Sequence, residues 1–113
     1  MATSEIILSN NTHSSESAIT ETVTGEKYKG DGYYGRRDGV HTVQYTYDSL
    51  NGSIIIQATL ALDPIDEDWF TVHLYNDSNG FGSRIINFTG NYVWIRAVVS
   101  FVGGTVDSIV LNH

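Results

Sequence analysis

Alternating apolar and polar positions recur along almost the whole chain, which is the pattern of half-buried β-strands. Short clusters of Gly, Asn, Asp and Ser separate the alternating runs and are typical of turns. The runs are rich in Ile, Val, Thr and Tyr and predict eight strands: Glu5–Ser9, Ala18–Val23, Val40–Asp48, Ser53–Leu62, Trp69–Tyr75, Arg84–Thr89, Tyr92–Phe101 and Thr105–Leu111. Pro64 and the acidic residues after it favour one helical or 3₁₀ turn. The pattern predicts an all-β, single-domain antiparallel β-sandwich of about eight strands with a jelly-roll-like arrangement.

The dipeptide Asn51-Gly52 indicates a two-residue hairpin turn, because both positions tolerate a positive φ. Closing the chain there places Tyr47 opposite Ile56 on an apolar face, while the other face of the two strands is polar. A shift of one residue would destroy this match. The sequence therefore predicts a hairpin around this turn, with His41 on its inward face.

A second hairpin is predicted at Gly103-Gly104, with Phe101 and its alternate neighbours facing the core. The opposite face of these two strands is also apolar and contains four side chains: Trp94, Val98, Ile109 and Leu111. In a two-layer domain this set would lie on the outside, covered either by a loop or the N-terminal strand, or by another protein. Because exposed apolar patches of several hundred Å² usually mark interfaces, both interpretations stay open.

Composition narrows the classes of function. The chain has 113 residues, a formal net charge of −7 and no cysteine. Without cysteine there is no disulfide framework, no Cys-ligated zinc site and no thiol nucleophile. The acidic charge argues against nucleic acids and anionic membranes as partners. No apolar run approaches the roughly 20 residues of a membrane-spanning helix, and we expect no secretory signal at the N-terminus.

The stretch GDGYYG, residues 30–35, matches the pattern G-x-G-x-x-G of dinucleotide-binding loops. Such a loop needs a helix after it, whereas a predicted strand follows here, so the glycines are interpreted as turn formers with positive φ. The acidic residues between Asp63 and Asp68 lack the EF-hand spacing of a calcium loop and are interpreted as solvated acids. The sequence contains no nucleophile elbow and no zinc-binding helix motif. We therefore expect no catalytic residue, no cofactor and no metal.

Four candidate contact residues form one aromatic and basic loop on an otherwise acidic protein: Tyr33, Tyr34, Arg36 and Arg37. Tyr and Arg are enriched at protein interfaces, because they bury a large area and also form hydrogen bonds. The same aromatic rings can stack on a sugar, in which case Trp69 and Trp94 would be further platforms. A structural interpretation, in which the tyrosines cover one end of the core, also stays open.

Four motifs give the chain a resemblance to a known group of proteins. They are a Gly-aromatic-aromatic-Gly turn, an Asp-Gly-x-His-Thr strand start, an Asp-Trp-Phe and a Gly-x-x-x-Trp-x-Arg-Ala strand, at Gly32–Gly35, Asp38–Thr42, Asp68–Phe70 and Gly90–Ala97. From about Gly30 onwards the chain resembles small β-sandwich domains in virion proteins of tailed bacteriophages, particularly marine and cyanophage-like ones. The resemblance implies a non-enzymatic structural role in the virion and supplies no active-site residue.

These observations lead to two hypotheses. The first is a virion subunit assembled in the host bacterial cytoplasm, either a capsid decoration or cement subunit or an accessory of the neck, tail or baseplate. Its partners would be further copies of itself and other capsid or tail proteins. The second is a carbohydrate-binding β-sandwich module that binds surface glycans. In both, residues 1–24 form a strand or arm packed on the domain or exchanged with a neighbour, and residues 25–113 form the sandwich.

Overall fold

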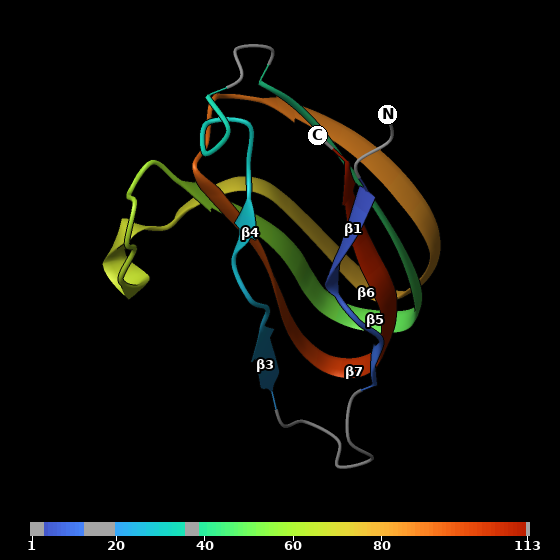
Figure 1. Cartoon of the computed structure of the whole chain (residues 1–113). Coiled ribbons are helices and arrows are strands. Elements are labelled where there is room, and N and C mark those ends of the chain that lie inside the picture. The colour runs from blue at the N-terminus through green and yellow to red at the C-terminus, as the bar shows by residue number, and fades with distance from the viewer. Residues whose placement is uncertain (1–3, 13–19, 36–38, 113) are drawn as a thin grey trace.

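The computed structural model describes residues 4–12, 20–35 and 39–112, and most of them lie in strands (Figure 1). Seven strands and one 3₁₀ helix follow one another along the chain: β1 (Ser4–Leu8), β2 (Asn11–Thr12), β3 (Glu21–Thr24), β4 (Tyr28–Lys29), β5 (Val40–Thr59), η1 (Asp66–Asp68), β6 (Phe70–Thr89) and β7 (Trp94–Asn112). β1, β7, β5 and β6 are neighbours in that order, and β2, β3 and β4 also pair with β7. The position of η1 confirms the turn predicted after Pro64.

Three long strands each contribute to both layers of a β-sandwich. β5, β6 and β7 contain 19 or 20 residues, and Figure 1 shows each of them curving from one layer into the other. Near its start β5 pairs with the ends of β6 and β7, and near its end it pairs with their beginnings, always antiparallel. The halves of these strands correspond to the separate strands that the sequence predicts. The predicted all-β antiparallel sandwich is therefore confirmed.

Neither predicted hairpin is present, because the chain bends at the turn signals without reversing. β5 continues through Asn51-Gly52, and β7 continues through Gly103-Gly104. The pairing of β5 with its two neighbours shifts register several times between Tyr47 and Gly52, and Gly104 has a φ of 99°. The backbone freedom of these residues therefore allows β-bulges, which curve a strand, in place of hairpin turns.

The core lies between the two layers and is built from alternate residues of the long strands. Its buried side chains form one cluster: Ile7, Leu8, Val43, Tyr45, Tyr47, Leu50, Ile54, Ile56, Ala58, Ile95, Ala97, Val99, Phe101, Val106, Ile109 and Leu111. The inward face predicted for the first hairpin is therefore confirmed for most of its residues, although its turn is wrong. Leu60 was predicted to share that face but is 68% exposed, because β5 ends at Thr59.

The predicted outer apolar face of β7 is wrong for Ile109 and Leu111, whereas Trp94 stays partly exposed. Ile109 and Leu111 are fully buried in the core, and Val98 is only 8% exposed. Val106 and Ile109 stand three positions apart, yet they pair with two β5 residues that are only two positions apart. This β-bulge reverses the alternation of the C-terminal half of the strand, so the residues expected outside point into the core.

The N-terminal strands complete the two layers. β1 pairs with the C-terminal half of β7 and buries Ile7 and Leu8, whereas β3 pairs with the N-terminal half of β7. Residues 1–24 therefore contribute strands to the sandwich, and their exchange with a neighbouring copy stays a prediction. Within the described ranges the structure contains no helix with the length and apolar character needed to cross a membrane.

Candidate functional site

The loop of residues 30–35 folds tightly against the segment that leads into β7. The backbone N–H groups of Gly30 and Gly32 donate hydrogen bonds to the carbonyl oxygens of Val93 and Tyr92, each at 2.9 Å. A Cβ atom on Gly32 would lie only 2.1 Å from the carbonyl oxygen of Asn91. Glycine is therefore needed at position 32 because two backbones approach closely. Among the three glycines of the loop, the predicted positive φ is found at Gly35 and is wrong for Gly30 and Gly32.

His41 contacts the backbone of this loop and of Gly39 from inside the fold. Its side chain is fully buried, its Nε2 accepts a hydrogen bond from the backbone N–H of Asp31 at 3.3 Å, and its Nδ1 donates to the carbonyl oxygen of Gly39 at 3.1 Å. The ring also stacks on Phe88, with 5.0 Å between the ring centroids. This pattern requires the neutral imidazole that carries its proton on Nδ1. The inward placement predicted for His41 is confirmed.

Three aromatic side chains gather beside the loop, and we call them the aromatic surface: Tyr33, Tyr34 and Trp94. The ring centroid of Tyr33 lies 5.1 Å from that of Trp94 and 5.6 Å from that of Tyr34. Tyr33 and Tyr34 are 45% and 48% exposed, and Trp94 is partly buried. The Nε1–H of Trp94 donates to the carbonyl oxygen of Leu62 at 3.0 Å, which fixes the orientation of the indole.

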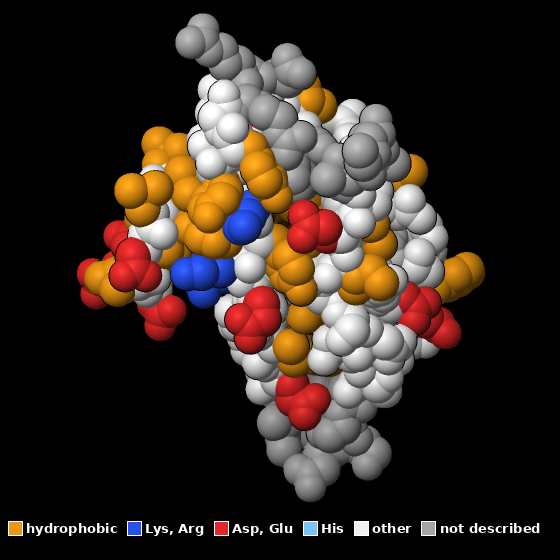
Figure 2. All heavy atoms as spheres, in the orientation of Figure 1, with side chains coloured by type: hydrophobic (Ala, Val, Ile, Leu, Met, Phe, Trp, Pro, Cys, Tyr) orange, Lys and Arg blue, Asp and Glu red, His pale blue; other side chains and the backbone are white. Residues whose placement is uncertain are grey.

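Two lysines accompany the aromatic surface. The Nζ of Lys27 lies 4.7 Å from the ring centroid of Trp94, and the Nζ of Lys29 lies 4.6 Å from that of Tyr33. Both are cation–π contacts, in which the ammonium group is attracted to the electron-rich face of the ring. Figure 2 shows basic side chains set among hydrophobic ones on this face of the molecule.

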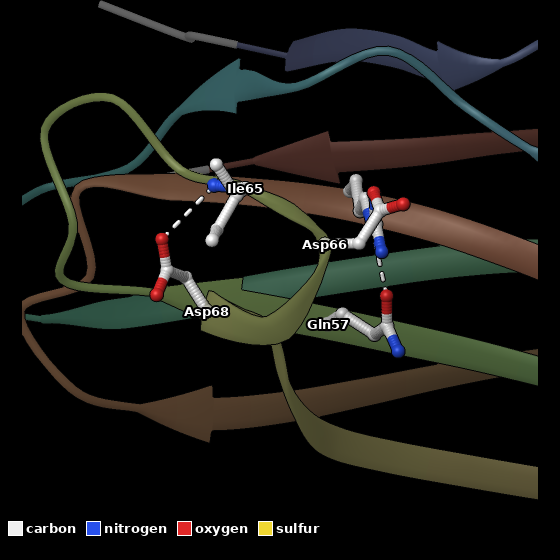
Figure 3. A network of polar contacts seen from close by, with 5 residues as sticks. Gln57, Ile65, Asp66 and Asp68 are labelled. Carbon is white, nitrogen blue, oxygen red and sulfur yellow. Dashed lines mark hydrogen bonds and ion pairs between the residues drawn. The ribbon is translucent and has the colours of Figure 1, made fainter.

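A polar groove of about 280 Å³ lies next to the aromatic surface and is lined by Lys27, Trp69 and Arg96, among others. Arg96 follows Trp94 by two positions on β7, so both side chains lie on the same face of the strand. The guanidinium of Arg96 lies 4.4 Å from the ring centroid of Trp69, and its Nε donates to Oε1 of Gln57 at 2.8 Å (Figure 3). The groove therefore combines an aromatic ring with fixed hydrogen-bonding groups.

A second, mainly apolar cavity of about 420 Å³ lies at the end of β5. It is lined by nine residues: Ala58, Thr59, Leu60, Ala61, Asp68, Phe70, Thr71, Val72 and Tyr92. Leu60 and Phe70 are 68% and 69% exposed, so the mouth of the cavity is apolar and open to solvent. Of the contact residues predicted from the sequence, none that the structure describes lines it.

Polar aromatic side chains form hydrogen bonds along β6, at the edge of the sheet away from the aromatic surface. The hydroxyl of Tyr45 lies 2.9 Å from Nε2 of His73, and that of Tyr47 lies 2.7 Å from the hydroxyl of Tyr75. The Tyr75 hydroxyl in turn donates to Oδ2 of Asp77 at 2.5 Å. His73 therefore points towards the buried Tyr45.

The pKa shifts along β6 belong to a structural network. Burial raises the pKa of Tyr45 to about 12, and the nearby Arg84 guanidinium partly opposes this shift. Burial, with a smaller effect from Arg84, lowers the pKa of His73. The hydrogen bond from Tyr75 to Asp77 is the main cause that raises the pKa of Tyr75 and lowers that of Asp77. These shifts favour neutral Tyr and His side chains beside an ionised Asp.

The acidic residues around η1 are engaged in local contacts. Oδ2 of Asp68 accepts a hydrogen bond from the backbone N–H of Ile65 at 2.9 Å (Figure 3), and Oδ1 of Asp66 lies 3.9 Å from Nη1 of Arg96. In the part of the chain that the structure describes, no three His, Asp or Glu side chains lie together in a group that could hold a metal ion.

The structure brings together some of the predicted contact residues and separates others. Tyr33, Tyr34 and Trp94 form one surface, whereas Val98, Ile109 and Leu111 are buried. Arg36 and Arg37 lie outside the described residues. Lys27, Lys29 and Arg96 also lie at this site but were not predicted as contact residues. The alternation of two lysines around Tyr28 could have indicated that both lysines share the outward face of a strand.

The fold and the site define a small β-sandwich domain that carries an aromatic surface on one face. No family model and no curated protein matches the chain. Among solved structures it is similar to a family 29 carbohydrate-binding module from Piromyces equi, with a TM-score of 0.51 and 9% identity, over 97% of this chain and 90% of that chain. It is also similar to a carbohydrate-binding module from Cellvibrio mixtus lichenase 5A, with a TM-score of 0.42 and 14% identity, over 96% and 98% of the two chains. At this level of identity, the similarity to the module from Piromyces equi shows the fold alone.

Proposed function

We propose that this protein is a carbohydrate-binding β-sandwich module without enzyme activity. The observation that carries the proposal is the aromatic surface, whose three rings are partly exposed and lie side by side. The fold supports the proposal, because the similar structure from Piromyces equi is a carbohydrate-binding module. Of the two hypotheses drawn from the sequence, the glycan-binding one is therefore the better supported.

Sugar rings present apolar C–H groups on their faces and hydroxyl groups around their edges. Tyr33, Tyr34 and Trp94 offer apolar faces on which the C–H groups can be buried, with little loss of side-chain entropy because the rings are already positioned. The neighbouring groove offers Arg96, which Gln57 holds in place through a hydrogen bond, for hydrogen bonds to hydroxyl groups. Aromatic stacking flanked by a few polar groups is the general design of a small-molecule site.

The polar groups of the molecule support binding over catalysis. Glycoside hydrolysis needs a carboxylic acid whose pKa is raised so that it can protonate the leaving group. The pKa of Asp77 is shifted in the opposite direction, downwards, by the hydrogen bond from Tyr75. His73 is held in its neutral form and lies against the buried Tyr45. These contacts stabilise the fold and lie along β6, away from the aromatic surface.

The virion role rests on the sequence motifs and stays a prediction. Glycan binding is compatible with it, because decoration and fibre domains of virions can bind host-surface sugars. Contacts with other virion proteins, oligomer formation and location in a virion are not needed for the proposed function.

The proposal is tested by binding to a panel of soluble polysaccharides, measured by affinity gel electrophoresis and isothermal titration calorimetry. Tyr34→Ala and Trp94→Ala should each weaken binding about tenfold or more, because an aromatic contact at the centre of a site is lost. Phe81→Ala is the matched control, since Phe81 is an 81% exposed aromatic residue in the middle of β6, away from the aromatic surface. Binding to no polysaccharide, or equal binding by all three variants, would contradict the proposal.

A further inference from the structure

The cationic side chains are concentrated on one face of an acidic protein. The chain carries a formal net charge of −7 with only six Lys and Arg residues. The structure describes four of these, and three of the four lie over rings on the face of the aromatic surface and its groove: Lys27 over Trp94, Lys29 over Tyr33 and Arg96 over Trp69. A binding face that is locally basic on an acidic molecule favours a ligand with negative charge.

The backbone directs both lysines to this face. Residues alternate between the two sides of an extended strand, and Tyr28, which lies between the lysines, packs against the hydrophobic core. Lys27 and Lys29 therefore both point outwards. β4 pairs with β7 and sets Lys29 directly beside Trp94. The ammonium groups are thus built into the aromatic surface by the register of two strands.

Nearby acidic side chains offset the positive charge of the groove more than they offset that of the aromatic surface. Glu26 and Asp66 line the groove together with Lys27 and Arg96. Among the described residues the one ion pair joins Arg96 to Asp66. Lys29, which lies over Tyr33, is not among the residues that line this groove. The positive charge of Lys29 therefore lies outside the groove, at the Tyr33 end of the aromatic surface.

The cation–π contacts also distinguish between neutral and anionic sugars. A neutral sugar that stacks on Trp94 or Tyr33 displaces an ammonium group from the ring and offers it only hydroxyl groups in return. A sugar that carries a carboxylate or a sulfate offers the displaced ammonium a charge-assisted hydrogen bond, which is about twice as strong as a neutral one. The lysines therefore select for charge while the rings supply stacking.

We propose that the ligand of the aromatic surface is an anionic polysaccharide, with its carboxylate or sulfate groups paired to Lys27 and Lys29 and its sugar rings stacked on Tyr33, Tyr34 and Trp94. This inference rests on the proposed function and adds the chemical class of the glycan.

The test compares polysaccharides that differ in charge. Polygalacturonate and its fully methyl-esterified form share one backbone, and a sulfated galactan and its desulfated form make a second pair, so the two arms distinguish carboxylate from sulfate recognition. The wild-type protein should bind at least one charged form about tenfold more tightly than its neutral partner. The double variant Lys27→Gln/Lys29→Gln should lose this preference, and Lys27→Arg/Lys29→Arg should keep it. Arg84→Gln, which removes a charge over Tyr75 at the β6 edge, should bind like the wild type.

The outcomes separate this inference from the proposed function. Binding of the neutral forms by the wild type as tightly as the charged forms, or an undiminished preference for the charged form in the double Gln variant, would overturn the inference and leave the carbohydrate-binding function in place. Equal binding of single-stranded DNA would reveal a general polyanion site and overturn the inference. Binding of none of these polymers, with the fold intact by circular dichroism, would overturn the proposed function itself. Weaker binding of the charged form at higher salt is also expected, because exposed charges are screened.

Discussion

His41 connects the buried core to the exposed loop through both of its ring nitrogens. Nε2 accepts a hydrogen bond from the backbone N–H of Asp31 in the loop, and Nδ1 donates one to the carbonyl oxygen of Gly39, just before β5. The ring stacks on Phe88. Both hydrogen bonds are made to backbone groups, so they position the backbone independently of the side chains that the loop carries. The inward face of His41 could be predicted from the alternation of its strand, but its two backbone partners depend on tertiary packing.

Replacement of His41 by Phe tests this role. His41→Phe preserves an aromatic ring against Phe88 but removes the acceptor for the Asp31 N–H and the donor to Gly39. We expect a loss of about 2–4 kcal/mol in the free energy of unfolding, because two backbone groups lose partners at a buried site. Urea denaturation measures this loss, and Val40→Thr, at a 51% exposed neighbour, should stay within about 0.5 kcal/mol of the wild type. A stable His41→Phe protein would show that the loop does not depend on this residue.

At the scale of elements, the curvature of β5, β6 and β7 is what makes a sandwich from a single sheet. Gly104 lies where β7 bends, has a φ of 99°, and a Cβ atom there would lie 2.3 Å from the carbonyl oxygen of Ser49 in β5. Its neighbour Gly103 has no atom within 4 Å of the corresponding Cβ position and no positive φ. The two adjacent glycines therefore have different roles in a bent strand.

Alanine substitution of each of the two glycines can distinguish a bent strand from a hairpin. In a bent strand Gly104→Ala should lower the free energy of unfolding by about 2–4 kcal/mol, because of backbone strain and a clash with Ser49. Gly103→Ala should leave stability unchanged or raise it by up to about 1 kcal/mol, because the unfolded chain loses entropy. A two-residue hairpin of type I′ would need a positive φ at both positions, so both variants would be destabilised. Chemical denaturation of the two variants decides between these outcomes.

The sequence allowed the strands, their inward faces and the η1 turn to be predicted, but not the connections between strands. Asn51-Gly52 and Gly103-Gly104 indicate local backbone freedom, and that freedom serves a bulge as well as a reversal. The error at Ile109 has the same origin, since a bulge before this residue reverses the alternation on which the prediction rested. Tyr33, Tyr34 and Trp94 could be predicted as contact residues from their type, but their meeting depends on the pairing of β4 with β7.

Over the whole molecule, the aromatic surface and the polar network occupy opposite edges of the sheet. The aromatic surface lies on the side of β4 and β7, whereas Tyr45, His73, Tyr75 and Asp77 connect β5 with the edge strand β6. The groups whose pKa values are shifted therefore lie away from the aromatic surface. We expect them to determine how the stability of the whole fold depends on pH.

On the acid side, the stability of the fold should fall in two stages. The pKa of His73 is lowered from 6.5, so below about pH 6.5 the unfolded chain binds a proton that the folded protein does not, and stability falls with pH. The pKa of Asp77 is lowered from 3.8, so its contribution is present above that value and is lost as the pH falls through its folded pKa. Thermal unfolding followed by circular dichroism should show the first stage as the pH falls below about 6.5, and His73→Gln should reduce it.

On the alkaline side, Tyr45 acts in the opposite direction. Its pKa is raised from 10.0 to about 12, so the unfolded chain releases the hydroxyl proton first as the pH rises. The stability due to Tyr45 is complete below pH 10 and is lost as the pH rises through about 12, and the raised pKa of Tyr75 acts in the same sense. Tyr45→Phe should therefore have a smaller fall in unfolding temperature above about pH 10 than the wild type, while the acid-side fall persists. An alkaline fall of unchanged size in Tyr45→Phe would mean that burial of this hydroxyl does not contribute to the pH dependence.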